Sequence, residues 1–274
     1  MTAHHYRCPM RWGDMDAQGH VNNAVYLDYF QDARVHFLLS GPPVLGRMLD
    51  SGVLVVSHQV EYLAPVIFSD RPLDLHLGIA QLGGSRFTIA YEVRDGDTLV
   101  ARARTGAVPY DLAGSSLRRL SAEERALLAE KEIVADPLRS VTAVPVTEHD
   151  HHYPLTVRWS DLDAYGHVNN VKYYDYIQEA RIALVTERFG SHDTGPWLVV
   201  RQDLDYRRPM DFRLEPYEVV TAVAAVGNRS ITLTAEVRDP GTDLAYAVAR
   251  TVLVGERPLT EDQRRELATP PPAR

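Results

Sequence analysis

One segment of this chain occurs twice, and the repeat limits the folds that the chain can adopt. Residues 11–34 read RWGDMDAQGHVNNAVYLDYFQDAR, and residues 158–181 read RWSDLDAYGHVNNVKYYDYIQEAR. Sixteen of these 24 positions are identical at a constant offset of 147 residues. Weaker matches follow downstream, where Glu92–Asp95 corresponds to Glu236–Asp239. A repeat on this scale predicts two domains of one fold in tandem, and a length of 274 residues is sufficient for both.

Each half shows the same order of predicted elements. A short strand comes first, near residues 5–12 and 153–159, and a loop rich in Asp and Gly follows. A helix is predicted next, near residues 22–39 and 169–188, because apolar residues in the first of these segments recur at steps of three and four. The later strands are rich in β-branched and aromatic residues and are predicted at residues 85–93, 99–108, 217–226, 230–237 and 245–254.

These elements predict the fold class and the domain boundaries. A long helix with a wide apolar stripe, followed by antiparallel strands, indicates an α+β fold in which a curved sheet wraps around one central helix. We expect an N-terminal domain at 1–125, a connector at 126–149 and a C-terminal domain at 150–274. Capping-box patterns that begin at Ser121 and Thr260 predict a short helix near the end of each domain.

The composition excludes several classes of function. The chain has a net charge of −8. It therefore lacks the excess of basic residues by which proteins bind nucleic acids or anionic membranes, and we expect neither as a partner. No apolar run approaches the roughly 18 residues of a membrane-spanning helix. The first residues lack the apolar core of a signal peptide, which predicts a cytoplasmic protein. Cys8 is the only cysteine and cannot form a disulfide within the chain. No nucleophile-elbow, phosphate-loop or dinucleotide-binding motif occurs.

The repeated segment carries the residues with the clearest chemical potential. Two carboxylates and a histidine precede each predicted helix: Asp14, Asp16 and His20 in the first half, and Asp161, Asp163 and His167 in the second. A helix N-terminus offers unpaired N–H groups and a partial positive charge, which can hold a developing oxyanion. A neighbouring carboxylate can act as a general base or as a nucleophile at a carbonyl carbon. This arrangement suits an activated acyl group such as a thioester.

Structural roles are open for the same residues. The first aspartate of each pair, Asp14 or Asp161, could stabilise the helix N-terminus electrostatically. The two histidines could be turn residues that bond to the backbone. Asn22 and Asn169 are expected to be helix N-caps, because their side-chain oxygens can accept from the first free N–H groups.

We expect no metal ion and no cofactor. The Asp-x-Asp-x3-His spacing has the residue types of a metal site, but carboxylates at a helix N-terminus already have a positive partner. We expect a solvated connector rather than a ligand cluster around His149, His151 and His152.

The pattern W-x-D-x-D-x-x-G-H-V-N-N-x-x-Y, present in both halves, resembles the hotdog-fold thioesterases of the 4-hydroxybenzoyl-CoA thioesterase type. It also resembles the acyl-ACP thioesterases of fatty acid synthesis. The resemblance implies two hotdog domains in tandem, each with a long central helix wrapped by an antiparallel sheet. It further implies that the two domains form an intramolecular pseudo-dimer, with the active sites where the halves meet.

The resemblance also implies roles for particular residues. The catalytic carboxylate of the 4-hydroxybenzoyl-CoA type falls on the second Asp of each repeat. Its helix N-terminal amide, which polarises the thioester carbonyl, falls on Asn23 and Asn170. The acyl-ACP type adds the histidine and an acidic residue on a later strand. The implied catalytic residues are Asp16, Asp163, His20, His167, Glu61 and Asp205, and the implied oxyanion and substrate-binding residues are Asn23, Asn170, Gly19 and Gly166.

One departure from the pattern bears on the substrate. The acyl-ACP enzymes have an Asn two residues after the key Asp, where this chain has Gln18 and Tyr165. We therefore expect an acyl-CoA thioesterase that releases a free acid and CoA, possessing two sites per chain and able to form homo-oligomers of tandem hotdogs. The alternatives are an enoyl-thioester hydratase or dehydratase on the same fold, and a non-catalytic acyl-CoA-binding protein.

The tandem reading makes a prediction about truncated proteins. In this fold each sheet has an edge and a face that a partner normally covers, so neither half is expected to be stable alone. Residues 1–125 and 150–274 expressed separately should give insoluble or inactive protein. Soluble, monomeric and active halves would contradict the tandem reading.

Overall fold

The computed structural model describes residues 3–189 and 197–268 and divides into two compact units, 1–139 and 140–274. Part of the expected connector belongs to the fold of the first unit. There α3 (Ala122–Ala129) continues to its end, and the N–H of Ile133 donates to the carbonyl of Ile79 at 2.9 Å. These contacts fix the chain as far as Ile133 to the first unit.

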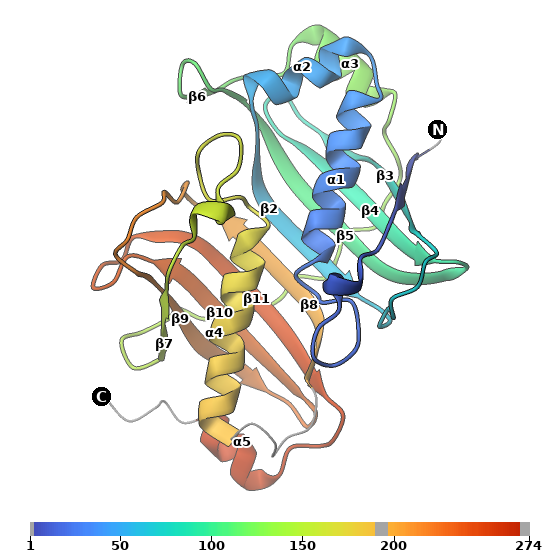
Figure 1. The fold of residues 1–274 in the computed structure, drawn as a ribbon. Coiled ribbons are helices and arrows are strands. Elements are labelled where there is room, and N and C mark those ends of the chain that lie inside the picture. Colours follow the sequence, from blue (N-terminus) through green and yellow to red (C-terminus); the bar gives the residue numbers. More distant parts are fainter. Residues whose placement is uncertain (1–2, 190–196, 269–274) are drawn as a thin grey trace. The chain divides into compact units, whose positions relative to one another are not determined.

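The first unit is an antiparallel sheet with a long helix across one face (Figure 1). Its strand order is β1-β3-β4-β5-β2, and a short β6 pairs with β5. The bounds in chain order are β1 His4–Cys8, η1 Trp12–Asp14, α1 Tyr26–Leu39, α2 Pro43–Ser51, β2 Val53–Tyr62, β3 Leu73–Leu82, β4 Phe87–Asp95, β5 Thr98–Asp111, β6 Ser116–Leu117 and α3 Ala122–Ala129.

The second unit repeats this plan. Its strand order is β8-β11-β10-β9-β7, again antiparallel, with α4 across one face (Figure 1). The bounds are β7 His151–Leu155, η2 Trp159–Asp161, α4 Lys172–Phe189, β8 Trp197–Tyr206, β9 Tyr217–Val226, β10 Ser230–Arg238, β11 Ala245–Gly255 and α5 Glu261–Ala268. The predicted α+β class and the tandem repeat of one fold are confirmed.

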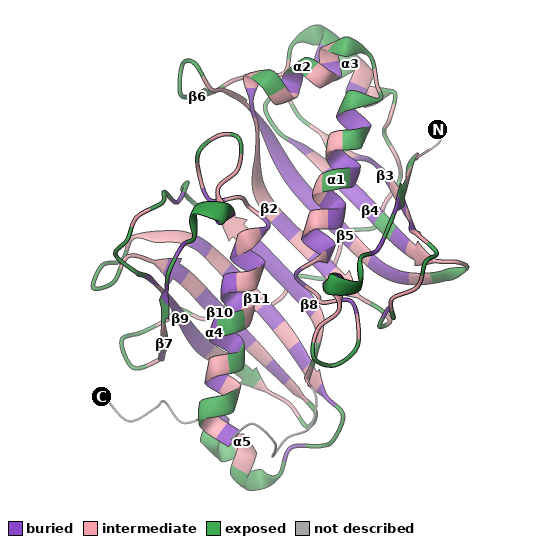
Figure 2. Ribbon diagram, viewed as in Figure 1, coloured by how far each residue is buried: buried purple, intermediate pink, exposed green. Residues whose placement is uncertain are grey.

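The core of the first unit lies between α1 and the sheet. Side chains alternate across a strand, and burial in the first half of β3 follows this alternation, whereas β5 is buried along most of its length (Figure 2). Leu75, Leu77 and Ile79 of β3 are fully buried. Phe30 of α1 packs on Tyr91 of β4 with ring centroids 4.9 Å apart. All five later strands predicted from the sequence are confirmed, each with ends within three residues of the prediction.

The long helices begin later than predicted, at Tyr26 and Lys172 instead of near residues 22 and 169. The reason is a tight turn before each helix. In the first unit the N–H of Val25 donates to the carbonyl of Asn22 at 3.1 Å, a three-residue step that belongs to a turn and not to an α-helix. The first four-residue step runs from the N–H of Tyr29 to the carbonyl of Val25.

The first strand of each unit is shorter than predicted, because the chain turns away from the sheet soon after it. β1 ends at Cys8, where Pro9 follows, and the chain then forms the short η1 helix. Proline has no N–H to donate to a ladder. In the second unit β7 ends at Leu155, before η2.

The expectation of a solvated connector is wrong for His151 and His152, because both lie on β7. His151 is 7% exposed, with its Nε2 3.4 Å from a carboxylate oxygen of Glu187 on α4. His152 Nδ1 lies 2.9 Å from Glu218 on β9. The triplet His-His-Tyr also forms the start of β1, so the repeat contained the signal for this strand.

The two short helices begin as predicted. At α3 the N–H of Glu124 donates to Ser121 Oγ at 3.1 Å, and the N–H of Ser121 donates to the carboxylate of Glu124 at 2.7 Å. At α5 Thr260 and Gln263 exchange the same pair of bonds at 3.2 and 2.9 Å. Within the described ranges no helix is long and apolar enough to cross a lipid bilayer.

Acidification is expected to weaken the attachment of β1 to α1. His4 Nε2 lies 2.9 Å from His36 Nδ1 of α1. Burial, followed by the nearby His36, Lys131 and His5, lowers the pKa of His4 below its ordinary value of 6.5. The folded state then binds fewer protons than the unfolded state, so stability is complete above that value and falls as the pH drops through the lower folded pKa.

The measurement is the melting temperature between about pH 8 and about pH 5. The His4→Gln variant should lose less stability on acidification than the wild type, because glutamine does not titrate. Equal losses in both proteins would show that His4 does not contribute to the acid sensitivity of this strand.

Candidate active site

The first aspartate of each repeat is a buried anchor. Asp14 is 3% exposed. Its Oδ2 accepts from the N–H of Arg11 at 2.7 Å and from the hydroxyl of Tyr29 on α1 at 2.7 Å. Its backbone carbonyl accepts from the N–H of Asn22 at 2.8 Å. Asp14 therefore ties both ends of the loop to the long helix, which is a different role from the helix-dipole contact considered above.

The second unit repeats this anchor. Asp161 is 7% exposed, and its Oδ2 accepts from the N–H of Arg158 at 2.8 Å and from the hydroxyl of Tyr176 at 2.6 Å. The N–H of Asn169 donates to its carbonyl at 2.8 Å. Burial, together with the bond to Asp161, raises the pKa of Tyr176 well above its ordinary range, so this hydroxyl stays protonated and remains a donor.

The sequence reasoning missed the tyrosines that complete these anchors. Tyr29 and Tyr176 occupy the same place in the two repeats, 15 residues after Asp14 and Asp161 respectively. Burial and the bond to Asp14 raise the pKa of Tyr29 above its ordinary range. The available signal was that the same residue type occupies this position in both repeats. No pattern within the helix relates a tyrosine to a carboxylate 15 residues before it in the sequence.

The second aspartate of the first repeat occupies a tight turn at the surface of the unit. Asp16 is partly buried. Its Oδ1 accepts from the N–H of Gln18 at 2.8 Å and lies 3.5 Å from the N–H of His20. Its own N–H donates to the carbonyl of His20 at 2.8 Å, and its carbonyl accepts from Gly19 at 3.0 Å. Gly19 has φ +79°, a left-handed conformation that glycine adopts without strain.

The turn around Asp163 has the same construction. Asp163 Oδ1 accepts from the N–H of Tyr165 at 2.9 Å. Its N–H donates to the carbonyl of His167 at 2.9 Å, and its carbonyl accepts from Gly166, whose φ is +82°. In both turns the other carboxylate oxygen, Oδ2, has no hydrogen-bond partner among residues 3–189 and 197–268. Each carboxylate is thus fixed through one oxygen and can react through the other.

The implied oxyanion position follows this turn directly. Asn22 Oδ1 accepts from the N–H of Ala24 at 2.9 Å, and its carbonyl accepts from the N–H of Val25. Asn22 therefore caps the turn that leads into α1, in agreement with the expected capping role. The two amides after Asn23 are thereby satisfied within the turn. In the second unit Asn169 accepts from Val171 through Oδ1 at 3.2 Å.

The two histidines differ in their surroundings. Both are partly buried beside the aspartate turn. His167 Nε2 lies 3.8 Å from Asp211 Oδ1. Asp211 is two residues after Pro209, and the matching position in the first unit, two residues after Pro65, is Ile67. The first-unit histidine, His20, therefore lacks the acidic neighbour of His167, and the two sites are chemically unequal.

Glu61 and Asp205 lie away from the aspartate turns of their own units. The hydroxyl of Tyr62 donates to the carbonyl of Asn23 at 2.7 Å, so Tyr62 faces the helix side of β2, and the adjacent Glu61 faces the opposite side. There Glu61 Oε2 forms an ion pair with Arg102 of β5 at 2.6 Å. Asp205 pairs in the same way with Arg250 of β11.

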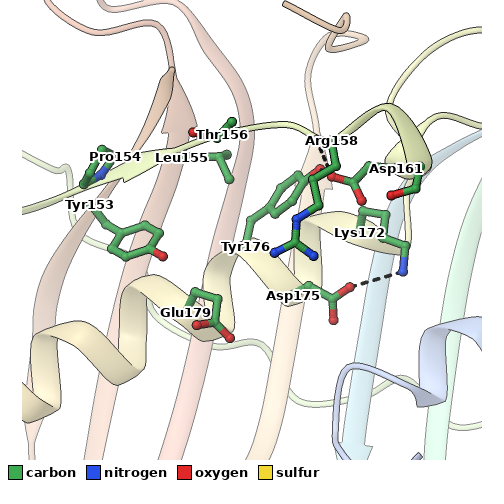
Figure 3. Close-up of a pocket in the computed structure, with 11 residues that line it drawn as sticks. Tyr153, Pro154, Leu155, Thr156, Arg158, Asp161, Lys172, Asp175, Tyr176 and Glu179 are labelled. Carbon is green, nitrogen blue, oxygen red and sulfur yellow. Dashed lines mark hydrogen bonds and ion pairs between the residues drawn. The ribbon is translucent and has the colours of Figure 1, made fainter. Parts of the chain in front are cut away.

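An open cleft of about 630 Å³ lies beside the loop of the second unit (Figure 3). β7 and α4 form its walls, and charged side chains project toward it, among them Arg158, Lys172, Asp175 and Glu179. Lys172 Nζ pairs with Asp175 at 3.3 Å. The anchoring Asp161 lines this cleft and Asp163 does not, so the cleft does not contain the candidate reactive carboxylate.

The cysteine is unsuited to act as a nucleophile. Burial, with Asp32 and Asp14 nearby, raises the pKa of the Cys8 thiol to about 12, so the thiol is a poor source of nucleophilic thiolate. Within the described residues no group of three His, Cys, Asp or Glu side chains is arranged to hold a metal ion.

Comparison with known proteins agrees with this geometry. Residues 10–140 and 157–272 match the model of the thioesterase-like superfamily. A protein of Aquifex aeolicus (strain VF5) named "Putative esterase" is 35% identical over 102 residues, which are 36% of this chain and 79% of that protein.

Two solved structures share the fold over most of the chain. The 12:0-ACP thioesterase from Umbellularia californica has a TM-score of 0.72 at 17% identity, covering 93% of this chain and 94% of that one. An acyl-ACP thioesterase from Bacteroides thetaiotaomicron VPI-5482 has a TM-score of 0.69 at 14% identity, covering 92% and 97%. At these identities the likeness concerns the fold alone.

The family match spans both units and includes both aspartate turns. The chain therefore belongs to the thioesterase-like superfamily, and the hotdog fold predicted by resemblance is confirmed. As a member of this family it is a thioester hydrolase.

Proposed function

We propose that this protein is an acyl-CoA thioesterase, which hydrolyses an acyl-CoA to a free acid and CoA. The observation that carries this proposal is the turn around Asp16 and its copy around Asp163. In each turn one carboxylate oxygen is fixed by a backbone N–H, and the other has no partner within the described residues. The turn that begins the long helix follows seven residues later, at Asn23 and Asn170.

These groups support a hydrolytic mechanism. Oδ2 of Asp16 removes a proton from a water molecule as the water oxygen bonds to the thioester carbonyl carbon. The carbonyl oxygen becomes an oxyanion, and the backbone N–H of Asn23 stabilises its charge. Collapse of the intermediate breaks the carbon–sulfur bond, and the proton held by Asp16 passes to the departing CoA thiolate. A bound acyl group also covers the partly exposed carboxylate and removes water from it, which strengthens it as a base.

The same geometry allows a covalent route. Asp16 Oδ2 can attack the carbonyl carbon directly, release CoA and form an acyl-aspartyl anhydride that water then cleaves. A single turnover in ¹⁸O-labelled water tests the covalent route. Label in the side chain of Asp16 or Asp163 identifies an anhydride that water cleaves at the aspartyl carbon. Label only in the released acid is the result expected both of general-base catalysis and of an anhydride that water cleaves at the acyl carbon.

CoA is the favoured carrier over the acyl carrier protein. Gln18 and Tyr165 stand where the acyl-ACP pattern has an asparagine. The net charge of −8 also opposes association with a carrier protein that is itself acidic. A homo-oligomer and a cytoplasmic location stay predictions of the sequence.

The decisive experiment follows the release of free thiol with a thiol-trapping dye across acyl-CoA substrates of increasing chain length. Turnover of one group of acyl-CoA substrates is the expected result. Tight binding without thiol release would identify a binding protein instead. Loss of enoyl absorbance with crotonyl-CoA, again without thiol release, would identify a hydratase. Turnover of acyl-ACP but not acyl-CoA would overturn the choice of carrier.

A further inference from the structure

A tyrosine at the end of one strand in each unit contacts the turn that carries the proposed oxyanion amide. The hydroxyl of Tyr62, the last residue of β2, donates to the carbonyl of Asn23 at 2.7 Å. The hydroxyl of Tyr206, the last residue of β8, donates to the carbonyl of Asn170 at 2.6 Å. Neither tyrosine belongs to the repeated 24-residue segment, and neither has a role in the mechanism above.

Packing holds each tyrosine in this orientation. The ring of Tyr62 meets the ring of Tyr26 edge to face, with centroids 5.3 Å apart at 85°. The opposite residue on β5 is Ala101, which leaves space for the larger ring. In the second unit Tyr206 meets Tyr173 at 5.2 Å and 87°. The same ring geometry therefore occurs in both units of the chain.

The segment after each tyrosine makes a second contact with the same turn. The carbonyl of Val66 accepts from the N–H of Val21 at 2.8 Å, and the carbonyl of Met210 accepts from the N–H of Val168 at 2.8 Å. In the first unit the segment from Tyr62 to Val66 thus forms hydrogen bonds with both ends of the segment from Val21 to Asn23. The bond from Tyr62 to Asn23 joins residues that are 39 positions apart in the sequence.

We propose that Tyr62 and Tyr206 are positioning residues for thioester hydrolysis, which hold the peptide at Asn23 and Asn170 at the orientation required to stabilise the oxyanion. This inference rests on the proposed function. The hydroxyl fixes the carbonyl of the same residue whose N–H faces the developing charge, so losing the bond lets that residue rotate. The catalytic rate depends steeply on such alignment, because a small misplacement of a hydrogen-bond donor lowers the rate of the chemical step more than it lowers the affinity for substrate.

The test removes the hydroxyl alone. Tyr62→Phe is made in an Asp163→Asn parent, so that the first unit supplies the measured activity, and Tyr206→Phe is made in an Asp16→Asn parent. We expect kcat for acyl-CoA hydrolysis to fall about 5- to 50-fold while KM changes less than about twofold. The shape of the pH profile should not change, because a positioning hydroxyl does not titrate during the reaction.

A second readout follows the turn itself. Hydrogen exchange of the peptide that contains residues 20–27 should become faster in Tyr62→Phe, even without substrate. The matched control is Tyr246→Phe in the Asp163→Asn parent, which removes a tyrosine bond of equal length, 2.7 Å to Asp239, from the unit that does not supply the measured activity. This control should leave kcat and the exchange of residues 20–27 unchanged.

Several outcomes overturn the inference. Unchanged kcat and unchanged exchange in Tyr62→Phe would show that the bond does not position the turn. A rise in KM alone would show that the tyrosine contacts substrate. An equal fall in the Tyr246→Phe control would show a general loss of structure. If Tyr62→Phe does not fold, Tyr206→Phe provides the same measurement in the second unit.

These results remain separate from those that test the function. If the single-site parents hydrolyse acyl-CoA and the tyrosine variants hydrolyse it at the same rate as their parents, the positioning role fails and the function stands. If no parent and no wild-type protein releases thiol from any acyl-CoA, the proposed function itself fails.

Discussion

Replacing both Asp16 and Asp163 with asparagine is expected to lower acyl-CoA hydrolysis by a factor of about 10²–10⁴ while leaving the fold intact. The swap is nearly isosteric, and the side-chain oxygen that accepts from Gln18 or Tyr165 remains. Asparagine cannot accept the proton of the attacking water, and its amide oxygen is a far poorer nucleophile. The measurements are steady-state rates of thiol release and the melting temperature of the same samples.

The single variants report how many sites work. If both units are active, Asp16→Asn and Asp163→Asn should each keep about half of the activity, since each removes one of two independent sites. We expect this result because the turn, its glycine and both asparagines are repeated in both units. The chemical difference at Ile67 and Asp211 predicts that the two remaining activities are not identical.

A matched control separates a site effect from a charge effect. Asp97→Asn removes one exposed carboxylate from the turn between β4 and β5 and should leave the rate unchanged. A double variant that melts normally and hydrolyses at the wild-type rate would remove Asp16 and Asp163 from the mechanism.

The second large effect concerns stability. Asp14→Ala should lower the free energy of unfolding by about 2–4 kcal/mol, because it leaves one buried and one partly buried donor without an acceptor. These donors are the hydroxyl of Tyr29 and the N–H of Arg11, both 2.7 Å from Asp14 Oδ2. Asp16→Ala, in a partly exposed turn, should cost less than about 1 kcal/mol. Urea denaturation of both variants provides the comparison.

A double-mutant cycle identifies the cause. Tyr29→Phe removes the donor that Asp14→Ala strands, so the double variant should be more stable than the sum of the two single losses predicts. Strict additivity would show that the bond between these residues does not account for the loss. An Asp14→Ala variant as stable as the wild type would contradict the anchoring role.

The repeat and the hydrophobic periods were sufficient for much of this structure. Two copies of one segment predicted two units of one fold, and the five later strands followed from β-branched residues with alternating polarity. These signals are local, since a period of two or of three to four residues depends only on neighbours in the chain. The start of the helix was the exception, because the turn at Asn22 competes with helical bonding over just three residues.

The residue types of the candidate site were also readable from the sequence, but their division of labour was not. Asp14 and Asp16 are two residues apart and chemically the same. One is buried against Tyr29, 15 residues away, and the other is held by its own turn with one oxygen unbonded. Which role falls to which residue depends on the side chain that α1 brings to the loop, and no local pattern encodes that contact.

The sequence by itself therefore determined the tandem repeat, the α+β class, the strands and the presence of carboxylates before a long helix. Only the tertiary structure decided that Glu61 faces away from the turn in its own unit, that the hydroxyl of Tyr62 bonds to Asn23, and that His151 meets Glu187 of α4. Each of these facts depends on the face to which a side chain points and on a partner 36 to 41 residues distant. Local propensity fixes elements, whereas the packing of distant elements fixes which of their polar groups meet.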